Sequence, residues 1–474
     1  MTAAKISHFS PLDPKAAEPY YRQIYERFRG AIAHGVLRPG DRIPSARALM
    51  EELGLSRGTI ESAYSLLAAE GYIEAHGQAG TTVARGIKAA RLLPPAPIPR
   101  SRDHAATTSF RPDSVLPFQM GLPAVDAFPR KVWARIGARA VRSMQPSRMA
   151  HPSVFGLEAL RVEIAAYLQV SRGIDCVPSQ VFVTSGYRNT LELIGQVLLK
   201  AGDRVWVENP GYPPTRDVLK RMRLSAVPVP VDHEGMIVAH GIRNAARARA
   251  AVVTPAHQSP LCVALSLPRR LALLDWASRN DSWIIEDDYD GEYRYVSRPL
   301  PAMKSLDRDG RVLYSGTFSK VIFPSLRLAY LVVPEAEVER FEEVSEALAG
   351  GSPELTQTIV AAFIREGHFA RHIQRMRKLY AERRAAAVAG LQATLAKFLD
   401  IDSPPGGMHL ILRLQGRRSD RRLVERMRES GLYAEALSEW AIGKDAASAL
   451  LVGFTNIDSE ATAESLGRRI AKLI

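Results

Sequence analysis

The segment VLYSGTFSKVIFPSLRLAYLV, residues 312–332, decides the fold of the larger part of this chain. It opens with β-branched and aromatic residues that are typical of a buried strand, and small hydroxyl residues then surround Lys320. A lysine that forms a Schiff base must be partly neutral, desolvated and close to an anion-binding cradle. Thr317 and Ser319 can bond a phosphate, and Arg327 can pair with it through two hydrogen bonds. The alternative is that Lys320 is an ordinary surface residue.

An acidic segment upstream, IIEDDYD at 284–290, ends another predicted strand. Pyridoxal 5′-phosphate (PLP) needs a carboxylate against its pyridine nitrogen, and we predict that Asp287 supplies it. Tyr289, on the same side of an extended segment, can reach the phenolic oxygen of that ring. The alternatives are a metal site or a solvated loop. A Mg²⁺ site, however, would leave Lys320 and Arg327 without a role.

Three further segments follow predicted strands, and each is compatible with the same cofactor. TSGY at 184–187 precedes a predicted helix, so its backbone N–H groups can hold a phosphate. In ENPGY at 208–212, Tyr212 either stacks on the pyridine ring or is a core tyrosine. In TPAHQSP at 254–260, His257 either donates to the phenolic oxygen or is a capping or core histidine.

From about residue 115 onwards, short β-branched runs alternate with amphipathic stretches, which predicts βα units around a mostly parallel sheet. Two later runs, HLILRL at 409–414 and ALLVGF at 449–454, predict a smaller α+β domain. Residues 86–114 contain four prolines between 94 and 99 and interrupt these patterns. We interpret them as a Pro-rich linker rather than a surface loop, so the predicted units are 1–85, the linker 86–114, and 115–474. The predicted strands of the large sheet are VFVT (181–184), RVWV (204–207), AVVT (251–254), WIIE (283–286) and VLYS (312–315).

The first unit has the pattern of a winged helix-turn-helix. Apolar residues at helical spacing predict a helix over 20–33. Ser45 and Ser56 can cap two further helices, which meet at the turn 53–56. YIEA at 72–75 and TTVA at 81–84 predict a hairpin wing. The alternative is a three-helix packing module with exposed arginines.

The same pattern gives a candidate DNA-binding surface, because a recognition helix presents its first turn to the major groove. Arg57 can contact a guanine edge or a phosphate, while Ser56 and Thr59 reach phosphates. Arg47 is placed to contact the backbone or a base. The wing around Gly80 and Thr81 can lie against the minor groove. The formal net charge of +13 fits such a partner, but residues 1–85 hold ten Lys/Arg and nine Asp/Glu, so the prediction depends on the pattern.

The remaining bulk properties narrow the class of protein. The chain has only two cysteines, Cys176 and Cys262, far apart in sequence. A disulfide framework is therefore not expected, and neither is a structural zinc site. We find no apolar signal peptide and no run long enough to span a bilayer. A cytoplasmic location without membrane contact is the expectation.

Both units resemble a known family. Residues 19–83, with the phrases LRPGDRIPSARAL and LGLSRGTIESAY, resemble the GntR-type winged-helix domain. Residues 115–474 resemble a fold-type I, class I aminotransferase domain. The phrases TPAHQSP, LALLDWA, IIEDDYDGEYRY and SGTFSKVIFPSLRLAYLV are similar to the MocR subfamily of GntR regulators. The resemblance implies PLP on Lys320, with the ring held by Asp287, His257, Tyr289 and Tyr212, and the phosphate by Ser185, Gly186, Tyr187, Thr317, Ser319 and Arg327. It further implies DNA contacts by Arg47, Arg57, Thr59 and the wing around Gly80, and a head-to-tail homodimer.

This sequence departs from the family pattern at three places. Cys262 replaces a usual glycine, and we expect it to be a small buried apolar residue. Arg188 and Asn189 stand where a glutamine pair is frequent. Leu451 occupies the position where aminotransferases use an arginine to bind the substrate α-carboxylate, and leucine cannot replace a guanidinium. Arg413 is a candidate substitute.

Three functions follow as hypotheses. The first is a PLP-dependent transcription regulator that binds double-stranded operator DNA. It would sense PLP, or an amine or amino acid that forms an aldimine with it, and control vitamin B6, amino-acid or amine metabolism. The second is an active class I aminotransferase with an accessory DNA-binding domain, against which Leu451 speaks. The third is a regulator that has lost PLP, which Lys320, Asp287 and Arg327 oppose. We favour the first, a regulator rather than an enzyme.

Overall fold

The chain forms two compact units, Met1–Pro112 and Asp113–Ile474, which are described separately. The computed structural model describes residues 12–14, 16, 18–77, 80–86, 115–146, 153–295, 301–348, 351–404, 406–416, 418–443 and 447–474. All but the first residue of the predicted linker 86–114 lies outside these ranges. Within them, no helix is both long and apolar enough to cross a membrane.

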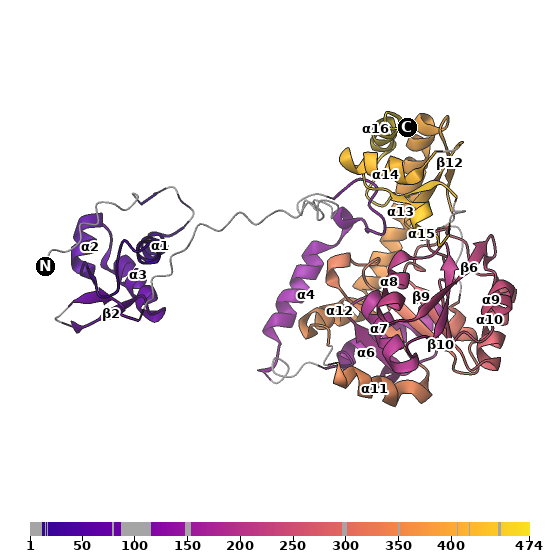
Figure 1. Ribbon diagram of the computed structural model, residues 1–474, viewed down its shortest axis with the longest axis horizontal. Coiled ribbons are helices and arrows are strands. Elements are labelled where there is room, and N and C mark those ends of the chain that lie inside the picture. The colour runs from indigo at the N-terminus through magenta and orange to yellow at the C-terminus, as the bar shows by residue number, and fades with distance from the viewer. Residues whose placement is uncertain are drawn as a thin grey trace. The chain divides into compact units, whose positions relative to one another are not determined.

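The first unit packs three helices against a small sheet (Figure 1). The predicted caps are confirmed: Ser45 Oγ accepts a hydrogen bond from the Ala48 N–H, and Gly54 ends the second helix with a φ of 67°. Ser56 caps the third helix, which ends at Ala69. A strand that we did not predict joins the hairpin. The elements are α1 (Tyr20–Ala33), β1 (Arg42–Ile43), α2 (Ala46–Leu53), α3 (Arg57–Ala69), β2 (Ile73–Ala75) and β3 (Thr81–Val83), with sheet order β1-β3-β2.

The second unit contains an eight-stranded sheet in the order β4-β11-β10-β9-β8-β5-β6-β7. β11 pairs antiparallel with both of its neighbours and β7 pairs antiparallel with β6, while the pairs from β10 to β6 are parallel. The mostly parallel sheet is therefore confirmed. The strands are β4 (Val181–Thr184), β5 (Arg204–Asn209), β6 (Ser225–Asp232), β7 (Gly235–Met236), β8 (Ala250–Val253), β9 (Trp283–Asp288), β10 (Val312–Thr317) and β11 (Ala329–Val332).

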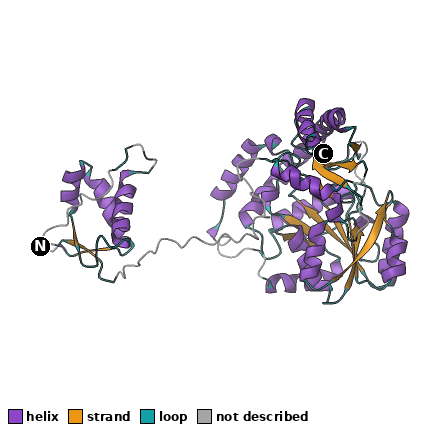
Figure 2. Cartoon of the chain, turned by 45° about the horizontal axis from the view of Figure 1, so that its top comes forward, coloured by secondary structure: helices purple, strands orange, loops and turns teal. Residues whose placement is uncertain are grey.

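Helices cover both faces of this sheet, as Figure 2 shows. One face shares a buried core with α7, α8 and α11, through strand residues such as Leu313 and Val205. The other face packs on α4, α6, α9, α10 and α12. The result is an α/β/α layer structure. These helices are α4 (Arg130–Arg142), α6 (Glu158–Arg172), α7 (Tyr187–Leu198), α8 (Pro213–Arg221), α9 (Val238–Ala245), α10 (Leu267–Arg279), α11 (Val338–Ala347) and α12 (Glu354–Arg365).

A smaller α+β domain follows, as predicted. Its sheet has the order β12-β13-β15-β14 and packs against α13 and α16. The long helix α13 belongs to both cores, because Phe369 is buried with the large sheet and Tyr380 with the small one. The elements are α13 (His368–Leu395), β12 (Leu399–Asp402), β13 (His409–Leu414), α14 (Asp420–Glu429), β14 (Glu435–Ala436), α15 (Leu437–Trp440), β15 (Ala449–Gly453) and α16 (Glu460–Ala471).

Candidate functional site

A cavity of about 300 Å³ lies at the carboxyl end of the large sheet, where loops after parallel strands converge. Its wall takes residues from the large sheet and from the smaller domain. Of the predicted site residues, the wall includes Gly186, Tyr187, Tyr212, Asp287, Tyr289, Thr317, Ser319, Lys320 and Arg327. Two predicted residues, Ser185 and His257, do not line it.

Lys320 follows the end of β10 and turns its amine into this cavity. Its Nζ donates a hydrogen bond to the Gly121 carbonyl at 3.0 Å. Burial lowers the pKa of Lys320, although the carboxylates of Asp290, Glu435 and Asp287 oppose that shift. Gly121 leaves room for the amine, since a Cβ there would lie 2.2 Å from Nζ. The lysine is thus a cavity residue and not the surface residue of the alternative interpretation.

Asp287 faces the same cavity from the neighbouring strand, in register with Ser315 of β10. Its side chain is nearly buried, and among the described residues no hydrogen bond to its carboxylate is present. Burial, together with Asp288, Glu208 and Asp290, raises the pKa of Asp287 well above its ordinary value. A buried carboxylate of this kind requires a cationic or hydrogen-bonding partner. The protonated ring nitrogen of PLP is such a partner, so the residues present fit this cofactor.

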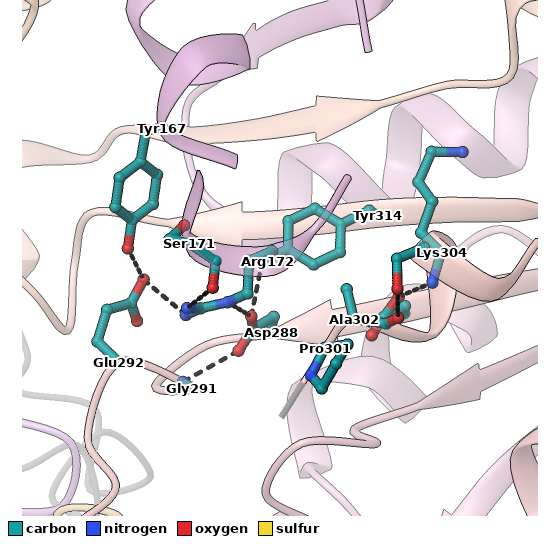
Figure 3. Close-up of polar contacts among 12 residues, drawn as sticks. Tyr167, Ser171, Arg172, Asp288, Gly291, Glu292, Pro301, Ala302, Lys304 and Tyr314 are labelled. Carbon is teal, nitrogen blue, oxygen red and sulfur yellow. Dashed lines mark hydrogen bonds and ion pairs between the residues drawn. The ribbon is translucent and has the colours of Figure 1, made fainter. Parts of the chain in front are cut away.

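Asp288 is also buried, but it belongs to a separate polar network (Figure 3). Arg172 Nε donates to Asp288 Oδ2 at 2.5 Å, and Arg172 Nη2 lies 2.9 Å from Glu292 Oε1. The hydroxyl of Tyr314 donates to Asp288 and that of Tyr167 donates to Glu292. This network therefore fixes the end of β9 and the position of Asp287. The described residues contain no cluster that could hold a metal ion, so the metal alternative has no support there.

Tyr289 lines the cavity, and His257 lies behind it. His257 Nδ1 is 3.2 Å from the Tyr289 hydroxyl and 3.1 Å from the Asp290 carboxylate. Burial alone would lower the pKa of His257, but Asp290 and Cys262 outweigh it and the pKa is raised well above its ordinary value. His257 therefore orients Tyr289 from behind the cavity wall.

The part of the cavity wall at the start of α7 has the character of an anion site. Gly186 precedes α7 with a φ of 112°, and a Cβ there would lie 3.8 Å from the Arg327 guanidinium. The amino end of α7 and Arg327 thus face the same space, together with Thr317 and Ser319. Ser185, by contrast, makes its side-chain contact with Ser352 at 3.3 Å. The Ser185 N–H donates to Asn189 Oδ1 at 3.0 Å, so Ser185 stays a prediction as a phosphate residue.

An aromatic wall closes the cavity beside this anion site. The rings of Tyr187 and Tyr212 are 5.8 Å apart, and those of Tyr212 and Trp440 are 5.6 Å apart. Tyr212 is 37% exposed, so it is not a core tyrosine. Trp440, Glu435 and His409 come from the smaller domain. No local motif marks these three residues or Gly121, and sequence reasoning did not find them.

The departures from the family pattern have structural consequences. Cys262 is buried with a left-handed φ of 62°, and its Sγ lies 3.2 Å from His409 Nε2. Burial opposes ionisation, yet His409 and His257 lower the pKa of this thiol to about 6. Cys262 is buried, as expected, but its thiol contacts His409, which the sequence analysis did not foresee.

Leu451 is fully buried in an apolar cluster, and Arg413 pairs with Asp402 at 2.6 Å. Arg413 does not line the cavity, so it does not replace the missing arginine. Arg188 lines the cavity, while the Asn189 side chain accepts from the Ser185 N–H.

The predicted DNA-contacting residues lie on the first unit. The side chains of Arg47 and Arg57 are 86% and 80% exposed, and each pairs only with a glutamate one helical turn away. Ser56 Oγ caps α3 and lies 2.8 Å from the Thr59 hydroxyl. Gly80 has a φ of 92° directly before β3, which begins at Thr81. Arg57 thus occupies the first turn of α3 with its charge in solvent, as a recognition helix requires.

Comparison with known families finds one family match in each of the two units. Residues 20–83 match the family of bacterial regulatory proteins called gntR, and residues 118–454 match the class I and II aminotransferases. The chain is 36% identical to a probable rhizopine catabolism regulatory protein, MocR, of Rhizobium meliloti, over 96% of this chain and 94% of that protein. It is 33% identical to the pyridoxine biosynthesis transcriptional regulator PdxR of Corynebacterium glutamicum, over 95% of each.

Solved aminotransferases share the fold of the second unit. A kynurenine aminotransferase of Pyrococcus horikoshii aligns with a TM-score of 0.69 and 26% identity, over 76% of this chain and 91% of that one. An α-aminoadipate aminotransferase of Thermus thermophilus, solved with N-(5′-phosphopyridoxyl)-L-leucine, aligns with a TM-score of 0.68 and 25% identity, over 76% and 92%. The chain therefore belongs to the MocR type of GntR-family bacterial transcription regulators, in which a DNA-binding winged helix is joined to an aminotransferase-like domain.

Proposed function

We propose that this regulator holds PLP in the cavity of its aminotransferase-like domain and uses the occupied site to control DNA binding. The observation that carries the proposal is a pair of groups facing one cavity: the part-buried Lys320 amine and the buried Asp287 carboxylate, which lacks a hydrogen-bond partner among the described residues. The lysine would anchor the aldehyde and the carboxylate would hold the ring nitrogen. When bound, PLP supplies an aldehyde that reacts reversibly with amines.

The other predicted residues have supporting roles. Tyr289, oriented by His257, would donate to the phenolic oxygen. Tyr212 would stack on the ring, and Arg327 would bind the phosphate with Ser185, Gly186, Tyr187, Thr317 and Ser319. Burial keeps the pKa of Lys320 low, so a larger fraction of the amine is neutral and nucleophilic.

We propose sensing rather than turnover as the use of this site. With Leu451 apolar and Arg413 paired to Asp402, the described residues of the smaller domain place no arginine on the cavity wall to hold an α-carboxylate. An aminotransferase acting on α-amino acids would need that cation. A PLP-binding amine would instead shift the balance between two packings of the domain, and thereby the affinity for DNA.

A homodimer would place two winged helices on paired half-sites of an operator. Genes of vitamin B6, amino-acid or amine metabolism are the proposed targets, in keeping with the regulator of pyridoxine biosynthesis among the relatives. The test is fluorescence anisotropy of the full chain on DNA from its own upstream region, with and without PLP and candidate amines. We expect PLP or an amine to change the apparent Kd. An unchanged Kd under every condition would refute the sensing role.

A further inference from the structure

On the side of the cavity formed by the smaller domain, the charged residue is the acid Glu435, whereas binding a substrate carboxylate would need a cation there. Glu435 of β14 pairs in register with Leu451 of β15, so the two side chains stand on the same face of the sheet. Leu451 packs with Ile411 and Trp440 in an apolar cluster, while Glu435 lines the cavity. Among the described lining residues, the smaller domain contributes no lysine or arginine.

The carboxylate of Glu435 has few hydrogen-bond partners for a group that is largely removed from solvent. Its Oε2 accepts one hydrogen bond, from Trp440 Nε1 at 3.0 Å, and this is the sole hydrogen bond to its side chain within the described ranges. Burial raises the pKa of Glu435, although Trp440 and Lys320 oppose the shift. A cation entering the cavity beside Glu435 would replace the lost hydration and favour the ionised carboxylate.

The aromatic residues next to Glu435 also favour a cationic ligand. Trp440, which orients the carboxylate, is 5.6 Å from Tyr212, and both line the cavity. The faces of aromatic rings attract ammonium and guanidinium groups. The two exposed cations on the cavity wall, Arg188 and Arg327, come from the large domain, where Arg188 stands in the first turn of α7 and Arg327 faces Gly186. Arg188 opposes the rise of the pKa of Tyr212, so it lies near that ring, whereas the smaller-domain side of the wall carries Glu435.

We propose that the effector is an amine with a second cationic nitrogen, a diamine or a guanidino-amine, whose distal charge pairs with Glu435 beside Trp440 and Tyr212. This inference rests on the proposed function, because the first amine is directed at the cofactor on Lys320. It assigns to the site a ligand whose second group is opposite in charge to the carboxylate of the α-amino acids that aminotransferases bind.

The test compares three ligands with the same four-carbon skeleton on the PLP-loaded full chain: 1,4-diaminobutane, n-butylamine and 4-aminobutanoate. The visible absorbance is recorded first to establish that the chain has taken up PLP. Isothermal titration calorimetry then gives the Kd of each ligand. We expect the diamine to bind about tenfold more tightly than butylamine, as one charge-assisted contact predicts. Glu435→Gln should remove most of that preference. The matched control is Glu439→Gln, an exposed acid on the adjacent α15 that does not line the cavity, and it should retain the preference.

Two results would overturn the inference. One is tighter binding of 4-aminobutanoate than of the diamine, which would identify Arg188 or another cation as the reader of an acid. The other is an equal loss for diamine and butylamine in Glu435→Gln, which would make Glu435 a partner of Lys320 alone. If Glu435→Gln does not fold, the Kd values of the three ligands on the unaltered chain still test whether the site prefers a second cation. A chain that takes up no PLP contradicts the proposed function itself, so the two failures are distinguishable.

Discussion

Replacing Arg172 with methionine should destabilise the aminotransferase-like unit strongly. Arg172 is 3% exposed and is the charged partner of two buried carboxylates, those of Asp288 and Glu292. Methionine fills a similar length of cavity but leaves both acids without their cation. Removing one partner of a buried ion pair typically costs about 3–5 kcal/mol. At roughly 2 °C or more per kcal/mol for a domain of this size, Tm should fall by about 6–10 °C.

The loss should depend on pH in a defined direction. Burial raises the pKa of Asp288, but Arg172 and Tyr314 lower it further, so the net shift is downward. A carboxylate with a depressed folded-state pKa stabilises the fold above its unfolded value, and the contribution is lost as the pH falls through the folded value. The difference in Tm between the Arg172→Met variant and the unaltered chain should therefore be largest near neutral pH and shrink in acid.

Tryptophan fluorescence isolates the relevant unit. All five tryptophans, at 133, 206, 276, 283 and 440, lie in the second unit, so a thermal scan reports its unfolding without interference from the winged helix. Arg279→Met is the matched control, because Arg279 makes only an exposed ion pair with Asp275 and its loss should change stability by about 0.5 kcal/mol at most. An Arg172→Met variant as stable as this control, or a loss independent of pH, would refute the role assigned to the network.

Three further predictions concern other parts of the chain. Arg57→Ala should weaken operator binding. If Arg57 contacts a base, the loss should be about 1–3 kcal/mol with relaxed specificity; if it contacts a phosphate, the slope of log K against log salt concentration should fall by about one. Anisotropy titrations at several salt concentrations check this, and an unchanged affinity would contradict it. Leu49→Ala, at a buried position of α2, should destabilise the winged helix by about 2–5 kcal/mol, seen as an earlier circular-dichroism transition without change in tryptophan fluorescence. Arg269 holds the pKa of Asp232 at about 2, so the stabilisation lost in Asp232→Asn should be present above pH 3.8, the ordinary value, and vanish as the pH falls through about 2. A Tm difference that persists in stronger acid would exclude this ion pair as its cause.

Local patterns predicted most of the architecture because they are short-range signals. Serine caps and the left-handed Gly54 marked the helix ends, and β-branched runs marked the buried strands. β6 was missed because Pro228 and Pro230 lack N–H groups and argue against a strand. They are tolerated because β7 pairs only with Val231 and Asp232, which leaves one side of β6 open at the prolines.

The residues of the candidate site likewise fall into those that local motifs predicted and those that they did not. Lys320 and Asp287 stand at strand ends in readable motifs, and register brings them to one cavity. Glu435, His409 and Gly121 reach that cavity from distant segments, and their approach depends on how the smaller domain packs on the large sheet. Such long-range placement leaves no periodic or motif signal in the sequence.

The most direct test of the account is to locate the covalent attachment of PLP. The full-length chain, incubated with PLP, is reduced with sodium borohydride to make the lysine link permanent, then digested and analysed by mass spectrometry. We predict a stoichiometric pyridoxyl mass on the peptide that contains Lys320, and its absence in Lys320→Ala. A label spread over other lysines, or no label on the unaltered chain, would contradict the central claim.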